Sequence, residues 1–574
     1  MLKSLFAIAA AIACVNVAQA QSIAITVQDA QTGTFIEGAA VQISNPKTVK
    51  SRLTTASGSA SFNPIEQAEY AVKVGMVGYE TISEKLVFAS AETSLVYKMV
   101  PITLQQQQVT VTAINTNKNG AFAYTNYKQA DLAKQNFGQD MPLLLQFSPS
   151  AVATSDAGNG VGYSGLRIRG SDATRINVTL NGVPVNDAES QGLFWVNMPD
   201  LASSVSNLQI QRGVGTSTNG AAAFGGSINI ETEKLQSNAY TEINNSYGSF
   251  NTWKNTAKFG TGLLKNKFAF NARLSQITSD GFIDRASSRL KSFYADGGYY
   301  GKTDMLKFVI MSGQERTYQA WNGVPAEIYA TNRTYNEFTY QNQVDNYNQS
   351  HYQLHYNKQL SDKWEGGVSA FYTRGFGYYE EAQYTANPFA ETGFSTYGIN
   401  PITLKAGQFF QGINDTLRTD TTLTSSDIIR RKWLDNHFYG VVGSVKYKTE
   451  KLQAIFGGGY NIYEGDHFGE VIWARYANNI NLGDRYYFNN AQKKDFNFYS
   501  KLTWELYNNF NMFLDFQYRG VSYSFKGENA KQQDANTVVH LSMFNPKAGL
   551  SYVLPNGQLL YGSYAVAQRE PNRN

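Results

Sequence analysis

Side chains able to do covalent or metal chemistry are few and dispersed in this sequence. Of the five histidines, only His351 and His355 have a His-x-x-x-His spacing. They lie in an alternating segment that is predicted to be a strand, where four residues span about 13 Å, too far apart for two zinc ligands. The single cysteine, Cys14, lies in an apolar N-terminal stretch, so no zinc site is predicted. No Ser-His-Asp order with a nucleophile elbow occurs. Gly213 and Gly215 lack the strand-to-helix context of a phosphate-binding loop. We therefore expect no catalytic residues, no metal site and no cofactor, which leaves binding as the chemistry to consider.

Candidate binding residues fall in two stretches that the pattern predicts to be loops. Asp466, His467 and Glu470 lie together and could touch a metal-bearing ligand, although charges in loops are usually only solvated. Trp321, in the tyrosine-rich segment 318–347, could stack on a ligand and is equally compatible with ordinary loop packing. The sequence of an irregular loop does not identify its ligand, so these residues predict where a ligand could bind but not which ligand it is.

The length and composition indicate several domains that are rich in β-structure. A chain of 574 residues exceeds what one small core usually supports. Aromatic residues make up 14% of the chain while the mean hydropathy is negative, as in a membrane barrel whose apolar and polar residues alternate. The net charge of +4 argues against nucleic acid as a partner. No apolar run of about 18 residues follows the N-terminal stretch, so no transmembrane helix is predicted.

Residues 1–20 are typical of a secretory signal peptide. Lys3 supplies the positive charge, an apolar run follows, and residues 18–20 (Ala-Gln-Ala) fit an A-x-A cleavage site. The sequence before Cys14 faintly resembles a lipoprotein cleavage box, but it lacks the usual leucine three residues earlier. Cleavage after Ala20 is the favoured interpretation, and it leaves a mature protein without cysteine.

Residues 166–232 contain four short alternating pieces that each include a glycine turn. In the second piece, Asn181-Gly182 is a strong tight-turn pattern, because both residue types tolerate positive φ. Gly225 and Gly226 flank small residues, so the backbone there can pack closely against another segment. The four pieces read LRIRGS (166–171), INVTLNGVPV (176–185), NLQIQRG (207–213) and NGAAAFGGSINIET (219–232).

This order of pieces resembles the plug domain of TonB-dependent outer-membrane receptors. The family pattern has an Arg-Gly pair, a DGVP-like hairpin, an RG after a strand and a Gly-Ala-rich run that ends in GGxINI, and all four occur here in order. Asn181 stands where Asp is usual, and residues 214–216 replace the usual proline-containing turn. The residues that carry the resemblance are Arg167, Arg169, Gly170, Asn181, Gly182, Arg212, Gly213, Gly225 and Gly226.

The resemblance implies an α/β plug domain over residues 115–232, and a helical pattern over 131–147 fits its helical part. Arg167 and Arg169 alternate on one predicted strand, so we expect both to face the barrel wall and to pair with acidic residues there. The alternative is a soluble α/β domain with glycine-rich turns, which the chain on either side of this stretch argues against.

The residues before the plug resemble two modules that accompany it in the family. Residues 21–100 alternate in short strands with regular turns, which predicts a β-sandwich. Their runs VQDAQTGTFIEGAAVQIS and YAVKVGMVGYE resemble the carboxypeptidase-regulatory-like domain of Bacteroidetes-type receptors. Residues 101–114 form a polar linker. It contains a β-prone segment that resembles the TonB box and is suited to strand addition on a partner, the alternative being the first strand of the next domain: Gln108, Val109, Thr110, Val111, Thr112 and Ala113.

From residue 237 to residue 574 the chain is predicted to form strands of a transmembrane β-barrel. Phe268, Phe270 and Leu274 share one face of a segment, and Asn271 and Arg273 share the other, as a strand between lipid and a wet lumen requires. Short turns alternate with long connections, which is the one-sided pattern of outer-membrane barrels. The long connections are predicted at 279–288, 314–346, 375–432, 465–493 and 520–537.

The alternation gives about thirteen strands, an odd number that a bacterial single-chain barrel normally avoids. The family barrel has 22 strands, and residues 544–571 resemble a late-middle part of it, so we expect the sequence to be a fragment. The predicted fold is mainly β, with an N-terminal β-sandwich, an α/β plug domain and an incomplete antiparallel transmembrane β-barrel with about 13 of the 22 strands.

The resemblance implies an active importer in the bacterial outer membrane and no enzyme. An extracellular ligand would bind the long loops and the plug, TonB would pair with the box from the periplasmic side and pull, lipid would surround the barrel, and nucleic acid has no role. The family imports ferric siderophores, haem, cobalamin and some glycans. An iron chelate is the first choice, since the plug lacks the extended pattern of the large glycan importers.

Two other classes of function remain alternatives. A passive or adhesive outer-membrane barrel without energy coupling would not need the box-like segment. A soluble, secreted β-rich binding protein would not need alternating short and long connections, nor strands with one lipid-type face, and its independence of detergent would identify it.

Overall fold

The computed structural model describes residues 21–572, except residues 31, 66–67, 77–78, 88–91, 101–121, 218–219, 221–223, 237, 266, 408 and 411–414. The chain divides into two compact units, residues 1–105 and 106–574. The predicted signal peptide and the predicted box at 108–113 lie outside the described residues and stay predictions. None of the helices in the described part of the chain combines the length and the apolar composition needed to cross a membrane.

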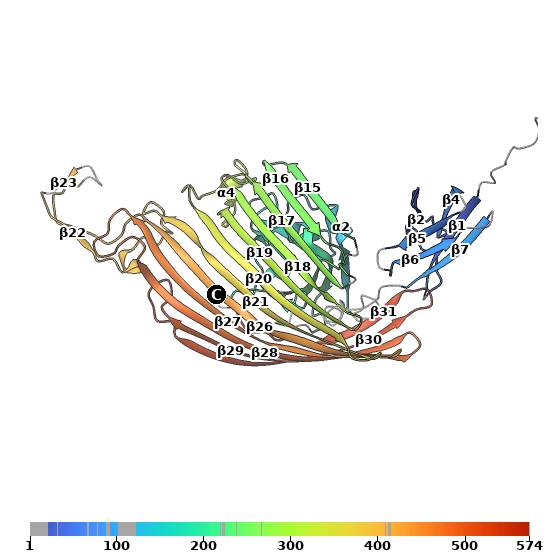
Figure 1. The fold of residues 1–574 in the computed structure, drawn as a ribbon. Coiled ribbons are helices and arrows are strands. Elements are labelled where there is room, and N and C mark those ends of the chain that lie inside the picture. The colour runs from blue at the N-terminus through green and yellow to red at the C-terminus, as the bar shows by residue number, and fades with distance from the viewer. Residues whose placement is uncertain are drawn as a thin grey trace, which may run out of the picture. The chain divides into compact units, whose positions relative to one another are not determined.

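The first unit is a β-sandwich (Figure 1). One sheet has the order β4-β1-β7 and the other β3-β2-β5-β6. Ile23, Ile25 and Val27 of β1 are buried in the shared core, because every second side chain of a strand points to the same face. Its likeness to the carboxypeptidase-regulatory-like domain stays a prediction. The strands are β1 (Gln21–Asp29), β2 (Ala40–Ser44), β3 (Val49–Leu53), β4 (Ser59–Ile65), β5 (Glu69–Gly75), β6 (Ile82–Val87) and β7 (Glu92–Met99).

The second unit opens with the small α/β plug domain. Its main sheet has the order β12-β11-β14-β13-β8, in which β11 and β14 are parallel, and β9 and β10 form a separate hairpin. All residues of β11 are buried, because this strand lies inside the sheet and both its faces are covered. The strands are β8 (Tyr124–Lys128), β9 (Ala151–Ser155), β10 (Ser164–Ile168), β11 (Ile176–Leu180), β12 (Val183–Pro184), β13 (Val205–Arg212) and β14 (Gly226–Thr232).

The helical pattern predicted over 131–147 is present as two single-turn helices, α2 (Gln129–Ala133) and α3 (Met141–Leu145). Gly138, at φ 120°, lies between them in a backbone conformation that interrupts a helix. Pro142 sits in the first turn of α3, where its missing N–H would have no intrahelical partner. Short 3-10 turns complete the domain: η2 (Ala173–Arg175), η3 (Trp195–Asn197) and η4 (Leu201–Ser204).

Thirteen antiparallel strands follow in one sheet, as predicted, and the sheet curves around the plug domain (Figure 1). Each strand pairs with its sequence neighbour in the sheet, and among the described residues the two end strands, β15 and β31, are not paired with each other. The strands are β15 (Tyr240–Gly248), β16 (Thr252–Gly260), β17 (Phe268–Ser279), β18 (Ser288–Tyr300), β19 (Asp304–Tyr318), β20 (Val344–Gln359), β21 (Trp364–Gln383), β26 (Ile428–Lys448), β27 (Leu452–Ala474), β28 (Arg485–Tyr507), β29 (Phe510–Gly527), β30 (Thr537–Val553) and β31 (Leu559–Ala565).

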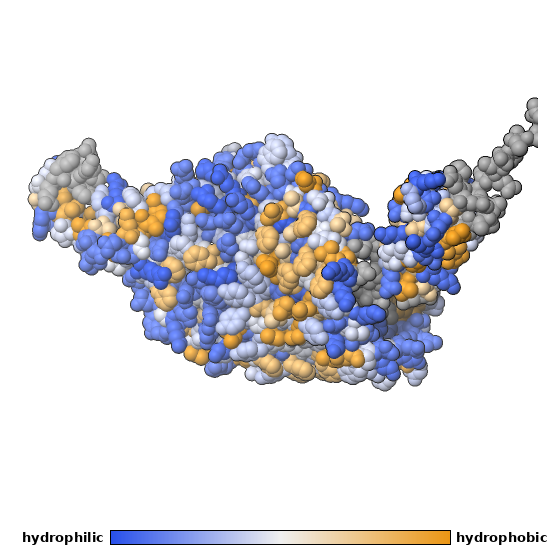
Figure 2. Space-filling model, viewed as in Figure 1, coloured by the Kyte–Doolittle hydropathy of each residue, from blue (hydrophilic) through white to orange (hydrophobic). Residues whose placement is uncertain are grey.

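The side chains of the barrel strands alternate as the sequence predicts. On β17, Phe270 and Leu274 are 39% and 62% exposed on the outer face, whereas Asn271 and Arg273 are 6% and 2% exposed on the inner face. Figure 2 shows apolar side chains gathered on the outer surface around β17, β18 and β19. An apolar outer face and a polar inner face are the arrangement that a strand between lipid and lumen needs.

All five long connections are shorter than predicted, and two of them are much shorter. β21 and β26 leave residues 384–427 between them in place of 375–432, and β27 and β28 leave 475–484 in place of 465–493. These strands have 20 to 23 residues, about twice what a bilayer requires. Beyond the lipid both faces of the sheet meet water, so the side chains no longer alternate between apolar and polar. The backbone hydrogen bonds between the strands nevertheless continue. Small elements lie in the connections: α4 (Ala326–Tyr329), η5 (Phe394–Tyr397), β22 (Ile402–Leu404), β23 (Phe409–Phe410), β24 (Asp415–Thr416) and β25 (Thr421–Leu423).

Candidate functional site

The glycine-rich motif residues of the plug meet at one corner. The N–H of Gly213 donates to the carbonyl oxygen of Gly225 at 2.7 Å. A Cβ atom on Gly225 would lie 2.6 Å from the Cβ of Ser171, and one on Gly226 would lie 2.6 Å from the carbonyl oxygen of Gln211. The backbone therefore approaches other segments closely at both glycines, as the sequence predicts.

The predicted tight turn joins β11 to β12 and also reaches the barrel wall. Asn181 and Gly182 have φ values of 54° and 84°. The Asn181 amide nitrogen donates to Oε1 of Gln353 on β20 at 3.1 Å, and its amide oxygen accepts from the N–H of Thr232 at 2.9 Å. A carboxylate can only accept, so asparagine suits a position that needs both a donor and an acceptor.

Arg167 and Arg169 do not hold the plug in the barrel, so that prediction is wrong. Both side chains are exposed, and within the described residues neither lies within ion-pair distance of a barrel carboxylate. β10 ends at Ile168, and Arg169, at φ 52°, already belongs to the following turn with Gly170. The two arginines therefore do not share a strand face. The motif's third arginine, Arg212, donates to the hydroxyl of Thr125 at 2.6 Å inside the plug.

The ion pairs between plug and barrel run in the opposite sense, from plug carboxylates to barrel cations. Asp200, just before η4, has a carboxylate that is fully buried; it lies 2.7 Å from Nζ of Lys254 on β16 and 3.4 Å from Nη1 of Arg273 on β17. Burial alone would raise the pKa of Asp200, but Arg273 and Lys254 hold that pKa well below its usual range. This carboxylate is therefore ionised and bound to two adjacent strands.

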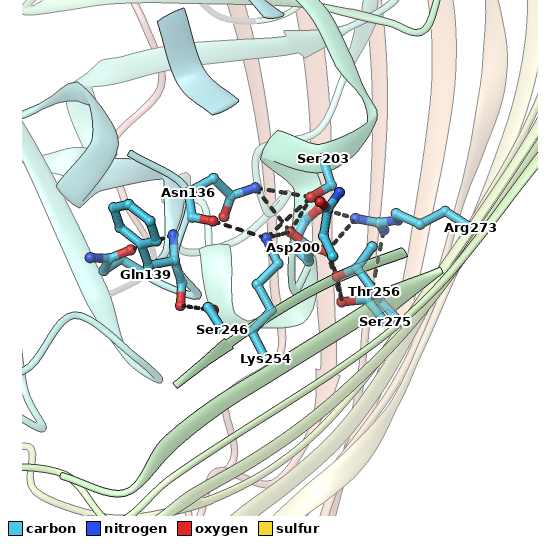
Figure 3. Close-up of polar contacts among 12 residues, drawn as sticks. Asn136, Gln139, Asp200, Ser203, Ser246, Lys254, Thr256, Arg273 and Ser275 are labelled. Carbon is cyan, nitrogen blue, oxygen red and sulfur yellow. Dashed lines mark hydrogen bonds and ion pairs between the residues drawn. The ribbon is translucent and has the colours of Figure 1, made fainter. Parts of the chain in front are cut away.

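Hydroxyl and amide groups complete the shell around Asp200 (Figure 3). The hydroxyls of Ser203, Thr256 and Ser275 donate to its carboxylate at 2.6, 2.8 and 2.7 Å, and the amide of Asn136 donates at 3.1 Å. We call this set the Asp200 cluster: Asn136, Asp200, Ser203, Lys254, Thr256, Arg273 and Ser275.

The three charged residues that were predicted to lie in a loop, Asp466, His467 and Glu470, all lie in strand β27. Asp466 and His467 point to opposite sides of this strand. Nε2 of His467 lies 2.7 Å from Oε2 of Glu189 in the plug, so His467 contacts the plug. Asp466 accepts from the amide of Asn490 at 2.6 Å. Across the described residues no group of three or more His, Cys, Asp or Glu side chains is placed to hold a metal ion.

A cavity of about 440 Å³ lies between the plug and the inner faces of β19, β20, β21 and β26. Glu315 and Asp345, from near the end of β19 and the start of β20, line it at the side of the long connections. Trp321, one of the predicted ligand residues, also lines it, whereas Asp466 and His467 do not. Glu470 does not line the cavity either, so the structure brings one of the four predicted ligand residues, Trp321, to a cavity.

Aromatic rings form one wall of this cavity. The Trp321 ring lies 5.7 Å from Tyr163 of the plug and 5.6 Å from Tyr379 of β21, edge-on to both. Phe194 lies 6.4 Å from Tyr163. The wall thus joins plug, barrel strand and long connection, so a ligand in the cavity would touch all three.

Carboxylates form the other part of the lining: Asp156, Asp187, Glu315 and Asp345. The hydroxyl of Tyr163 donates to Asp345 and lies 3.4 Å from Oε1 of Glu315. Burial raises the pKa of Tyr163 well above its usual range and raises the pKa of Asp156 to about 6. At neutral pH the Tyr163 hydroxyl therefore keeps its proton and Asp156 is ionised.

Sequence reasoning missed Tyr163, Glu315 and Asp345. The two acids occupy inward positions of barrel strands, where polar residues are expected in any case. Only the register of β19 against β20, which sets Thr317 opposite Asp345, brings them together. The alternation of side chains shows which face of a strand a residue lies on. It does not show which residue lies opposite on the next strand, unless the length of the connection between the two strands is also known.

The family model described as the TonB-dependent Receptor Plug Domain matches residues 116–227. That range holds the plug domain up to the start of β14. The comparison with curated proteins found no match.

Solved structures of outer-membrane receptors share the fold of this chain. The unliganded ferric citrate transporter FecA has a TM-score of 0.59 at 14% identity, with 78% of this chain and 62% of that chain covered. The open form of the ferric-catecholate import receptor Fiu from E. coli K12 has 0.55 at 13%, covering 79% and 71%. The ferric yersiniabactin uptake receptor FyuA from Yersinia pestis has 0.56 at 12%, covering 79% and 66%. The chain thus spans about three fifths of the length of the ferric citrate transporter.

Proposed function

We propose, from the premise that this chain belongs to the TonB-dependent outer-membrane receptors, that it imports a scarce extracellular ligand across the bacterial outer membrane. The observation that carries the proposal is a plug domain bound inside a curved sheet of thirteen strands, with a cavity at the side of the long connections. A passive pore has no use for a plug that fills its lumen. A receptor needs one, because the lumen must stay closed until ligand is bound.

An iron chelate is the first candidate ligand. The similar structures include a ferric citrate transporter, a ferric-catecholate import receptor and a ferric yersiniabactin uptake receptor. Haem, cobalamin and glycans are the alternatives within this function. The aromatic wall around Trp321 suits any of them that presents a ring or an apolar arm.

Energy coupling in this proposal comes from residues 108–113. This segment would add a strand to an open sheet edge of TonB, and TonB would pull on it from the periplasmic side. The first described strand after the segment is β8, at one edge of the plug sheet. The pull would therefore reach the plug at an edge strand, which pairs with β13 alone among the strands that the structure describes.

The test is ligand uptake by cells that carry the gene with Val111→Pro, against a panel of ferric siderophores, haem, cobalamin and oligosaccharides. Proline removes a backbone donor and blocks strand pairing. Val111→Ala, which keeps that donor, is the matched control. We expect the intact protein and Val111→Ala to import one ligand, and Val111→Pro to bind it at the surface with uptake reduced at least tenfold.

Equal uptake by all three proteins would overturn the assignment of the box and favour the passive barrel. Import of haem, cobalamin or an oligosaccharide, blocked by Val111→Pro, would keep the importer and replace the iron chelate.

A further inference from the structure

We propose that the cavity lined by Tyr163, Trp321, Glu315 and Asp345 recognises a positively charged arm of the ligand, such as one that ends in a protonated amine. The inference rests on the proposed function and names the chemistry that the site would select. It concerns the charge of the ligand, which the fold alone leaves open.

The carboxylates of the cavity differ from the others between plug and barrel in having no cation beside them. Asp200, Glu233 and Glu189 each lie within 3.1 Å of a lysine or histidine nitrogen. By contrast, no lysine, arginine or histidine nitrogen in the described part of the chain lies within 4.0 Å of the cavity's four carboxylates, which are those of Asp156, Asp187, Glu315 and Asp345. Glu315 and Asp345 are buried, and buried charges in proteins are ordinarily paired, so this pair leaves a place for a positive charge.

The two deepest carboxylates share one donor. Glu315 is 1% exposed and Asp345 is 9% exposed. The Tyr163 hydroxyl supplies a single proton to the pair, and the hydroxyl of Thr317 donates to Glu315 at 2.8 Å. Each carboxylate has about four acceptor positions, so most of them stay open. An ammonium group carries three donors and one positive charge, which is the complement of this pair.

The aromatic wall favours the same kind of ligand. A cation placed over an aromatic face is attracted by the ring's quadrupole. The cavity already uses this interaction, because Nζ of Lys432 lies 5.6 Å from the centre of the Tyr379 ring. Lys432 is the one lysine or arginine among the described lining residues. Asn197, also in the lining and buried, has an amide oxygen without a donor among the described residues, which a donor-rich ligand arm suits.

The experiment compares two iron chelates that differ only in this charge. One is the ferric complex of a linear trihydroxamate with a free terminal amine, and the other is the same complex with the amine acetylated. Equilibrium binding to the purified receptor is followed by tryptophan fluorescence. We expect the amine complex to bind at least tenfold more tightly, and Glu315→Gln with Asp345→Asn to reduce this preference to less than threefold.

Asp420→Asn is the matched control, because Asp420 is an exposed loop carboxylate outside the cavity lining; it should keep the full preference. If the double variant loses its protease-resistant plug, Asp156→Asn replaces it, since that side chain lies at the same cavity. Equal binding of both complexes, tighter binding of an anionic tricatecholate complex, or binding of neither complex would overturn the proposal. Import of another ligand that depends on Val111 would then leave the proposed function standing, whereas no such import would remove both.

Discussion

Two buried carboxyl groups of the plug, those of Asp200 and Asp140, are stabilised in opposite protonation states. Asp200 lies beside two barrel cations and is held ionised. Asp140 is 5% exposed and has no lysine, arginine or histidine nitrogen within 4.0 Å among the described residues; burial raises its pKa to about 8, although Ser164 donates to its carboxylate at 2.9 Å. The same residue type thus acts as a charge in one place and as a neutral hydrogen-bonding group in the other.

Asp140 should make the stability of the plug depend on pH. Its folded-state pKa of about 8 lies above the unfolded value of 3.8, so the folded state holds the proton more tightly. This contribution to stability is fully present below about pH 4 and is lost as the pH rises through about 8, at up to about 1.4 kcal/mol per pH unit. Asp140→Asn, which keeps an acceptor for Ser164, should protect α3 better than the native residue at pH 8 and equally at pH 4.

Amide hydrogen exchange of residues 141–145, compared between the two proteins at each pH, measures this difference. Equal protection at pH 4 and at pH 8 would mean that the Asp140 carboxyl titrates as an ordinary exposed acid.

The contact between β19 and the 3-10 turn η3 depends on a single glycine. A Cβ atom on Gly313 would lie 2.1 Å from the carbonyl oxygen of Asn197 and 2.7 Å from Cδ of Pro199. Gly313→Ala should therefore push η3 away from the barrel wall and destabilise the plug by about 1–3 kcal/mol, as overpacking does elsewhere. The urea concentration at which protease first cuts the plug reports this loss.

Gly520, on β29, is the matched control because a Cβ atom there has no heavy atom within 4 Å. Gly520→Ala should leave the midpoint unchanged or raise it slightly, since glycine weakens a strand interior. Equal midpoints for the two variants would show that η3 does not rest on the wall at Gly313.

Many of the strands and turns could be predicted from the local pattern of residues. The alternation of Phe270 and Leu274 with Asn271 and Arg273 marked β17 and its two faces, because the side-chain period of a strand is fixed by the backbone. Asn181-Gly182 marked a turn because few other residue pairs adopt two successive positive φ values at low cost. The strand ends were wrong where the sheet leaves the lipid, because pairing continues there without a lipid-facing pattern.

Contacts between elements could not be predicted in the same way. Asp200 meets Lys254 and Arg273, and Tyr163 meets Glu315 and Asp345, through the seating of the plug in the sheet. The position of the plug depends on how its surface fits the inner face of the sheet, and no spacing of residues in the sequence predicts this fit. The arginine prediction failed for this reason, since a strand pattern does not say which domain faces it.

At the scale of the whole molecule, the Asp200 cluster fastens the plug to the first barrel strands. Asp200→Asn would leave Lys254 and Arg273 buried without a negative partner, and breaking a buried pair in this way costs about 3–5 kcal/mol. We expect the plug to become protease-sensitive at much lower urea while the barrel sheet stays folded. Proteolysis across a urea series, with tryptophan fluorescence for the barrel, separates the two events.

Asp420→Asn serves as the control here too, because the Asp420–Lys405 pair lies in solvent and such pairs contribute little to stability. An unchanged plug midpoint in Asp200→Asn would contradict the role given to the cluster.

The antiparallel pairing of β8 with β13 sets how the plug bears mechanical load. Tyr124 of β8 pairs with Gln211, and Lys128 pairs with Asn207, so the end of β8 that the proposed pull would reach lies at the far end of β13 from Val205 and the adjoining Asp200 cluster. Under the proposed function, tension from the N-terminal side would therefore draw β8 one way while β13 is anchored at the opposite end. This is shear loading, in which all the ladder hydrogen bonds carry force together. The two strands would therefore separate abruptly at a threshold force, and their hydrogen bonds would not break one after another.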